Sequence, residues 1–209
     1  MEIPKLLSTA YLPSIAWFQH ALSGQEFYIE SQENFVKQSY RNRSKILTAN
    51  GVLDLIVPIC HHKEKQLITD IRINENEAWR KQHWQAICSA YGKSAFFLYY
   101  RDSLEHLYFG SNQKNLFDWN YDLIKLLIKL LKLELQPKYT KEFEKQPLGK
   151  TDLRNAFVAK GNPPFEELLF TKKYYQVFAE KFEFVPNLSV LDLLFNVGPI
   201  SGDYLKDEV

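Results

Sequence analysis

The chain is short of cysteine, and it contains no long uninterrupted apolar run. Its two cysteines, Cys60 and Cys88, are too few for a disulfide framework, and its first residues lack the charged, apolar and small-residue order of a signal peptide. We therefore expect a reducing, cytoplasmic location. The longest apolar run, residues 123–135, is interrupted by three lysines and one glutamate, so we expect no membrane insertion.

Recognisable catalytic motifs are missing as well. The chain contains no glycine-rich phosphate loop and no GxSxG, HExxH or paired-carboxylate signature, which removes several enzyme classes. Cys60, His61 and His62 suggest a metal site, but no second Cys/His pair follows at ligand spacing, so we interpret them as a solvated loop. A nucleophilic Cys60 beside a histidine stays an open alternative. We expect neither a metal nor another cofactor.

Charge of one sign is not in excess either. The formal net charge is +1, which gives no sign of an extended nucleic-acid-binding surface. The 209 residues, of which 45% are hydrophobic and 24% charged, suit one soluble, globular domain over 1–209. The aromatic content of 15% fits proteins that bind sugars or rings, and it fits an ordinary packed core equally well.

What the chain does contain is a cationic run that leads into a hairpin, between residues 30 and 59. The turn Asn50-Gly51 lies between apolar runs, and both residues tolerate the positive φ of a type I′ turn, so we predict a hairpin. Residues 36–47 alternate like a strand. One face of that strand would carry Lys37, Ser39, Arg41, Arg43 and Lys45. The alternative is a helical turn or loop over 34–41, which would scatter the cations.

Hydrophobic periodicity predicts the other elements. We expect strands near the N-terminus and at 26–29, 67–73 and 174–184, and helices at 14–21, 76–92, 94–109 and from 118 or 120 to 133. The proline-rich region 134–164 reads as loop with one short element near 152–159. The elements together predict an α+β fold, a mainly antiparallel sheet from the N-terminal half plus one C-terminal strand, packed with about four to five helices.

The last helix has a full set of end signals. Ser189 is the expected N-cap, Asp192 the capping-box acid three residues later, and Gly198 the C-terminal cap before Pro199. Asp192 and Asn196 also lie one turn apart, so the alternative is that they serve a site together.

Two groups of residues suggest binding or catalysis. His83 shares a predicted helix face with Trp79 and Ile87, where burial would lower its pKa enough for a general base near neutral pH. The alternative is a buried histidine bonded to a backbone carbonyl. The cations of 37–45 suit an anionic small molecule, because the arginine fork matches carboxylate and phosphate. Their alternative is a solvated strand face paired with nearby acidic residues.

Several blocks of the chain resemble one known family. They are Tyr11-Leu12-Pro13 with Trp17-Phe18, NFVKQSYRNR at 34–43, Trp79 with His83-Trp84, YQVF at 175–178 and PNLSVLDLLFNVGP at 186–199. In this order they resemble the WbqC-like proteins over nearly the whole chain. The resemblance implies a bacterial protein of O-antigen or surface-polysaccharide gene clusters.

That resemblance also suggests a function, without known catalytic residues to carry over. It implies a transferase that passes glycine or another aminoacyl group to an amino sugar, and the alternative is a non-catalytic nucleotide-sugar-binding or scaffold protein of the same pathway. The expected partner is a nucleotide-linked sugar or other anionic small molecule. Aminoacyl transfer needs a base, an oxyanion donor and a cationic hold on the substrate.

We assign candidate residues to these roles. His83 is the candidate base, and Asn42 is the candidate oxyanion donor. The candidates for substrate binding are Asn34, Lys37, Arg41, Arg43, Gln176, Asp192 and Asn196.

Overall fold

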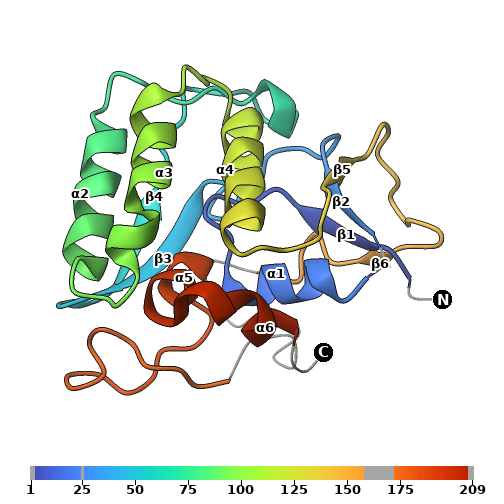
Figure 1. The fold of residues 1–209 in the computed structure, drawn as a ribbon. Coiled ribbons are helices and arrows are strands. Elements are labelled where there is room, and N and C mark those ends of the chain that lie inside the picture. Colours follow the sequence, from blue (N-terminus) through green and yellow to red (C-terminus); the bar gives the residue numbers. More distant parts are fainter. Residues whose placement is uncertain (1–2, 25, 158–171, 207–209) are drawn as a thin grey trace.

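The largest sheet of the molecule is parallel. The computed structural model describes residues 3–24, 26–157 and 172–206. Four short strands form the sheet in the order β5-β2-β1-β6 (Figure 1), with parallel pairing throughout. Their bounds are β1 Lys5–Ser8, β2 Phe27–Glu30, β5 Lys138–Tyr139 and β6 Thr151–Asp152.

The prediction of a mainly antiparallel sheet is therefore wrong, although the mixture of helices and strands is as expected. Among the described residues, antiparallel pairing of whole strands is confined to the hairpin of β3 (Arg43–Thr48) and β4 (Gly51–Ile56). The hairpin itself is confirmed, and Gly51 has the expected positive φ of 101°. Helix α1 (Ile15–Leu22) connects β1 to β2, and a helical crossover of this kind allows the two strands to run parallel.

Two predicted strands are not formed, and a third is formed only in part. Of the predicted strand 36–47, residues 43–47 belong to β3, whereas 36–42 lie in a loop, which is the alternative given for 34–41. Gln38 in this loop has a left-handed φ of 58° that no strand allows. Residues 67–73 contain the short 3-10 helix η1 (Ile68–Asp70) between isolated bridges. Residues 174–184 make turns, with Phe182 N–H bonded to Phe178 C=O at 3.0 Å.

The predicted helices are confirmed with shifted ends. The remaining helices are α2 Trp79–Tyr91, α3 Phe97–Gly110, α4 Leu116–Leu130, α5 Val190–Val197, the 3-10 turn Gly198–Ile200 and α6 Ser201–Lys206. Helix α4 begins earlier than predicted because the Asn115 side chain caps it, accepting from the backbone of Phe117 and Asp118. Near 152–159 only β6 is seen, and residues 158–164 of the predicted loop lie outside the described residues.

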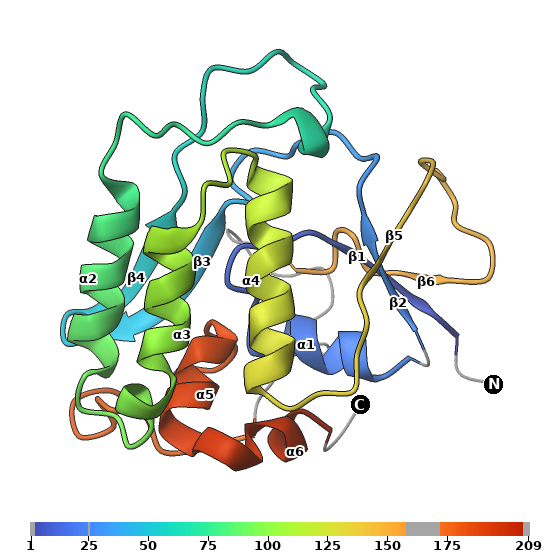
Figure 2. The ribbon, with the colours of Figure 1, turned by 45° about the horizontal axis from the view of Figure 1, so that its top comes forward.

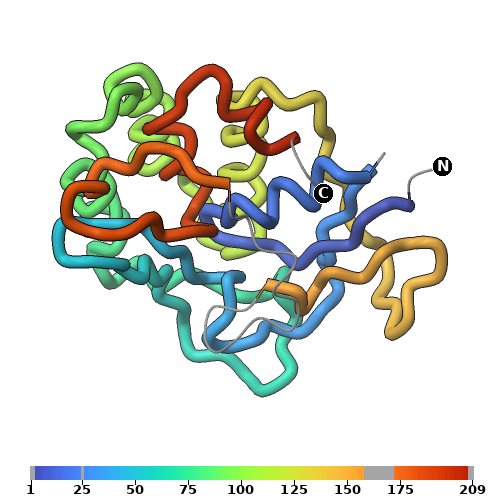
Figure 3. The backbone as a smooth tube through the Cα atoms, turned by 90° about the horizontal axis from the view of Figure 1, so that it is seen from below, coloured from blue at the N-terminus to red at the C-terminus, as the bar shows by residue number. Residues whose placement is uncertain are grey.

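Helices cover the hairpin and the sheet on separate sides. Helices α2, α3 and α4 lie side by side (Figure 2), with α2 packed on β3 of the hairpin, while α5 and α6 lie next to α1 (Figure 3). The centre of the core contains the fully buried indoles of Trp17, Trp79 and Trp119. In the described part of the chain, no helix combines the length and the apolar character that crossing a bilayer requires.

Buried ion pairs lie beyond the carboxyl end of the parallel sheet. Glu30, fully buried at the end of β2, accepts from Arg154 Nη1 at 3.0 Å and from Thr140 Oγ1 at 2.5 Å. Glu33 accepts from Arg41 Nε at 2.8 Å and Nη2 at 2.5 Å. Arg41 Nη2 also donates to the Arg154 carbonyl at 3.4 Å, which connects the two pairs. The loop at 34–42 is thereby fixed to the sheet.

Removing one partner of this network tests its role. We expect Arg41→Met to lower the free energy of unfolding by about 3–5 kcal/mol, because it leaves the Glu33 carboxylate buried without its cation. Adding Glu33→Gln should restore a large part of that loss. Urea denaturation measures both effects.

The half-exposed pair Lys45–Asp54, with side chains 31% and 37% exposed, provides the control. Lys45→Met should cost less than about 1 kcal/mol. A cost for Arg41→Met as small as this would show that the buried pair does not hold the loop.

Candidate functional site

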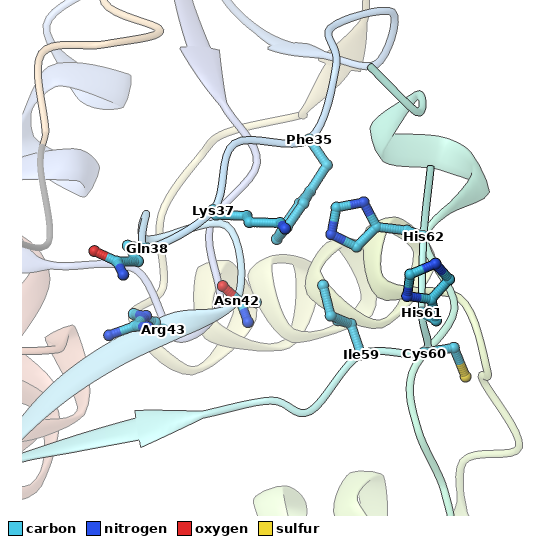
Figure 4. Close-up of a pocket in the computed structure, with 9 residues that line it drawn as sticks. All are labelled: Phe35, Lys37, Gln38, Asn42, Arg43, Ile59, Cys60, His61 and His62. Carbon is cyan, nitrogen blue, oxygen red and sulfur yellow. The ribbon is translucent and has the colours of Figure 1, made fainter. Parts of the chain in front are cut away.

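A pocket of about 410 Å³ lies where the loop 34–42 enters β3 and where the chain leaves β4 (Figure 4). A volume of this size suits a small-molecule ligand. The lining residues come from both segments and are Phe35, Lys37, Gln38, Asn42, Arg43, Ile59, Cys60, His61 and His62. The sequence predicted Lys37, Asn42 and Arg43, and the structure brings these three together.

Backbone hydrogen bonds hold the two walls of the pocket in place. Phe35 N–H donates to Gln66 C=O at 2.8 Å, and Cys60 N–H donates to Arg72 C=O at 2.9 Å. Where the walls meet, Val57 N–H donates to Asn42 C=O at 2.9 Å. Apart from Arg43 at the start of β3, the pocket is thus formed by segments that lie outside the regular strands, as binding sites commonly are.

Unpaired cations give the pocket its charge. Lys37 is exposed, and neither it nor Arg43 forms an ion pair with any described residue. The Nε of Arg43 is buried and has no hydrogen-bond partner there. None of the described lining residues carries a carboxylate. An anion entering the pocket therefore meets two positive charges and no negative one.

Asn42 presents an oxygen, although we predicted a donor role for its amide. The side chain is only 7% exposed, and its Nδ2 donates to Val57 C=O at 2.9 Å, which fixes the orientation of the amide. Its Oδ1 is buried and lacks a partner among the described residues. In Figure 4 this oxygen points to the side of Gln38 and Arg43, away from the strand that leads to Ile59.

The opposite end of the pocket is formed by rings. The rings of Phe35 and His62 meet edge to face, with centroids 5.3 Å apart and planes at 81°. His62 Nδ1 lies 3.0 Å from Lys63 C=O, and because a carbonyl only accepts, Nδ1 carries the proton. Nε2 is then an acceptor, and it points toward Lys37 in Figure 4. We expected His61 and His62 to lie in a solvated loop without a role, and this loop lines the pocket.

His83 lies in a different place. It is buried on α2 with Trp79 and Ile87, as the helix pattern predicted, but it does not line the pocket. Its Nδ1 bonds to Tyr11 Oη at 2.8 Å, and Tyr11 Oη lies 2.5 Å from Tyr108 Oη. Burial lowers the pKa of His83 to about 4, and a hydrogen bond with the backbone of Ile56 opposes the shift.

The other candidate residues are also apart from the pocket. Arg41 is turned inward to Glu33, and Asn34 is exposed beside the pocket without lining it. Asp192 accepts from Tyr174 Oη at 2.6 Å and from Gln176 Nε2 at 2.9 Å. Asn196 Nδ2 donates to the backbone carbonyl of Asp192 at 2.8 Å.

These last contacts change the interpretation of the C-terminal helix. Ser189 caps α5 as predicted, accepting from Leu191 N–H at 3.3 Å, but its own N–H donates to Lys45 C=O at 2.8 Å. Asp192 therefore does not close a capping box, since its carboxylate is directed to Tyr174 and Gln176. Burial raises the pKa of Asp192, and the hydrogen bonds from these side chains oppose that effect.

Comparison with known proteins identifies the family of the chain. A family model described as the WbqC-like protein family matches residues 9–160, a span that includes the whole pocket. The chain belongs to the WbqC-like protein family. This WbqC-like protein is also 27% identical to the uncharacterized protein Rv1507c of Mycobacterium tuberculosis, over 99% of this chain and 98% of that protein. No solved structure matches the chain significantly.

The low pKa of His83 predicts how stability depends on pH. The folded value is about 4 and the ordinary value is 6.5, so the unfolded chain binds a proton that the folded chain does not. This stabilisation is present above pH 6.5 and is lost as the pH falls through 4, by about 3 kcal/mol in total. Urea denaturation at pH 7 and pH 4 measures it.

The variant His83→Asn keeps an acceptor for Tyr11 and cannot be protonated in this range. It should show a smaller loss of stability between pH 7 and pH 4 than the unmodified protein. His106→Asn, at an exposed position of α3, is the matched control for removing an imidazole. An unchanged loss in His83→Asn would contradict the burial of a neutral imidazole.

Proposed function

We propose that this WbqC-like protein is a transferase of surface-polysaccharide biosynthesis whose pocket holds an anionic, nucleotide-linked substrate. Membership of the family supports a role in polysaccharide-related biosynthesis. The convergence of Lys37, Asn42 and Arg43 on one pocket without a lining carboxylate carries the rest of the proposal. Phosphate groups are the anions that such a pair of cations binds best.

The proposed reaction is the transfer of an aminoacyl group, such as glycine, to an amino sugar. The sugar amine attacks the carbonyl carbon of an activated ester, a C–N bond forms, the ester C–O bond breaks, and the amine proton ends on the leaving alkoxide. The amine needs a proton acceptor during this step. We assign it to His62, whose Nε2 points into the pocket, in place of His83, whose Nδ1 is bonded to Tyr11 in the core.

The second candidate is a protein of the same pathway that binds a nucleotide sugar without transforming it. The absence of any recognised catalytic motif favours it. A transferase requires His62, whereas a binding protein requires only the cations, so His62→Gln separates them. Under the first proposal this variant binds ligand and has lost transfer.

The proposal also includes the organisation and the location of the protein. We propose a single domain over 1–209 and a cytoplasmic location, because the exposed thiol of Cys60 suits a reducing compartment.

Ligand binding is the first test. In a thermal-shift screen of nucleotide sugars, aminoacyl donors and phosphate, a true ligand at one hundred times its Kd should stabilise the protein by about 2.7 kcal/mol. Arg43→Gln and Lys37→Ala should each weaken binding by about tenfold, because each removes one charged hydrogen-bond donor. Titration calorimetry measures the change.

Lys81→Ala removes an exposed lysine of α2 that does not line the pocket, and it serves as the matched control. This control should bind like the unmodified protein. If Arg43→Gln and Lys37→Ala also bound like the unmodified protein, the pocket would not be the anion site.

A further inference from the structure

We infer that Asn42 makes this pocket selective for a sugar phosphate, a ligand with a hydroxyl or amine donor beside its phosphate, over a phosphate ester that lacks such a donor. The inference rests on the proposed function and names the substrate class of the same site. It starts from two buried polar atoms on neighbouring residues, Asn42 Oδ1 and Arg43 Nε, neither of which has a partner in the described part of the chain.

A buried polar atom without a partner is costly to the folded protein. The usual cost is about 1–3 kcal/mol for each group. The described residues contain seven other such atoms, and Asn42 Oδ1 and Arg43 Nε are the two that belong to residues lining the pocket. Exchanging the positions of the Asn42 amide oxygen and nitrogen would not remove this cost, because Nδ2 would then lose its hydrogen bond to Val57 C=O. The neighbouring side chains of Lys37 and Gln38 do not donate to Oδ1 either. A ligand is therefore the group that can complete this site.

The two atoms differ in what they require. Oδ1 accepts and needs a donor, whereas Arg43 Nε–H donates and needs an acceptor. The unprotonated oxygens of a phosphate ester suit Arg43, but they have no proton to donate to Asn42 Oδ1. A sugar phosphate suits both residues, because a hydroxyl or amine group near the phosphate donates to Oδ1 while the phosphate accepts from Arg43.

The size and charge of the pocket agree with this ligand. The volume of about 410 Å³ is larger than a phosphate needs and leaves room for a sugar ring. Lys37 supplies a second positive charge for the phosphate without competing for the Asn42 oxygen. A ligand without the hydroxyl would leave the buried Asn42 oxygen unpaired, and this cost makes such a site discriminate strongly between the two ligands.

Titration calorimetry with matched phosphates tests the inference on the unmodified protein. The ligands are inorganic phosphate, glucose 1-phosphate and cyclohexyl phosphate, which has a ring of similar size without hydroxyl groups. We expect glucose 1-phosphate to bind about tenfold more tightly than cyclohexyl phosphate, or better. Equal affinities for these two ligands would overturn the inference and leave the anion site of the proposed function intact.

Two variants separate the donor and acceptor roles. Asn42→Leu should remove the preference for glucose 1-phosphate over cyclohexyl phosphate, and the comparison of two ligands on one variant cancels any loss of stability. Arg43→Gln should weaken both ligands equally and keep the preference. A preference that survived in Asn42→Leu would overturn the role of Asn42. Failure of all three ligands to bind the unmodified protein would overturn the phosphate site and the inference together.

Discussion

The pair of Glu33 and Arg41 is the interaction on which the pocket depends. It buries two full charges at the point where the loop 34–42 leaves the sheet, and the contact of Arg41 with the Arg154 carbonyl extends it to the strand β6 side. A buried charge is tolerated only where its partner is correctly placed. The loop is therefore held in one position by electrostatics, although it has no regular secondary structure.

This arrangement divides the cations of one short segment by function. Arg41 is neutralised in the interior, while Lys37 and Arg43, on either side of it, remain free for an external anion. If Arg41, Lys37 and Arg43 had all faced solvent on one strand, water and counterions would have screened their charges. Because Arg41 points inward to Glu33, the loop can place Lys37 and Arg43 in the lining of one pocket.

Local chemistry was predictable from the sequence, and pairing between distant segments was not. The hairpin at Asn50-Gly51 was predicted because two adjacent residues determine the turn. The parallel sheet was not, because its strands pair with partners that lie far along the chain, and the pattern of one strand does not determine the direction in which its partner runs. The strands β5 and β6, of two residues each, are also too short to show a period. Lys37 and Arg43 were identified by the clustering of cations, although the single strand assumed for them forms only from Arg43 on. His62 was missed because only the folded chain brings it to Phe35.

The hydrogen-bonded series His83–Tyr11–Tyr108 has a consequence for how this sequence can diverge. Each of these side chains is buried, and each bonds to another member of the series. Replacing Tyr11 with an apolar residue removes the partner of both His83 Nδ1 and Tyr108 Oη, whereas replacing Tyr108 leaves Tyr11 bonded to His83. Replacing His83 also removes the hydrogen bond to the backbone of Ile56. Tyr11 is therefore the member of the series whose loss leaves the most polar atoms without a partner.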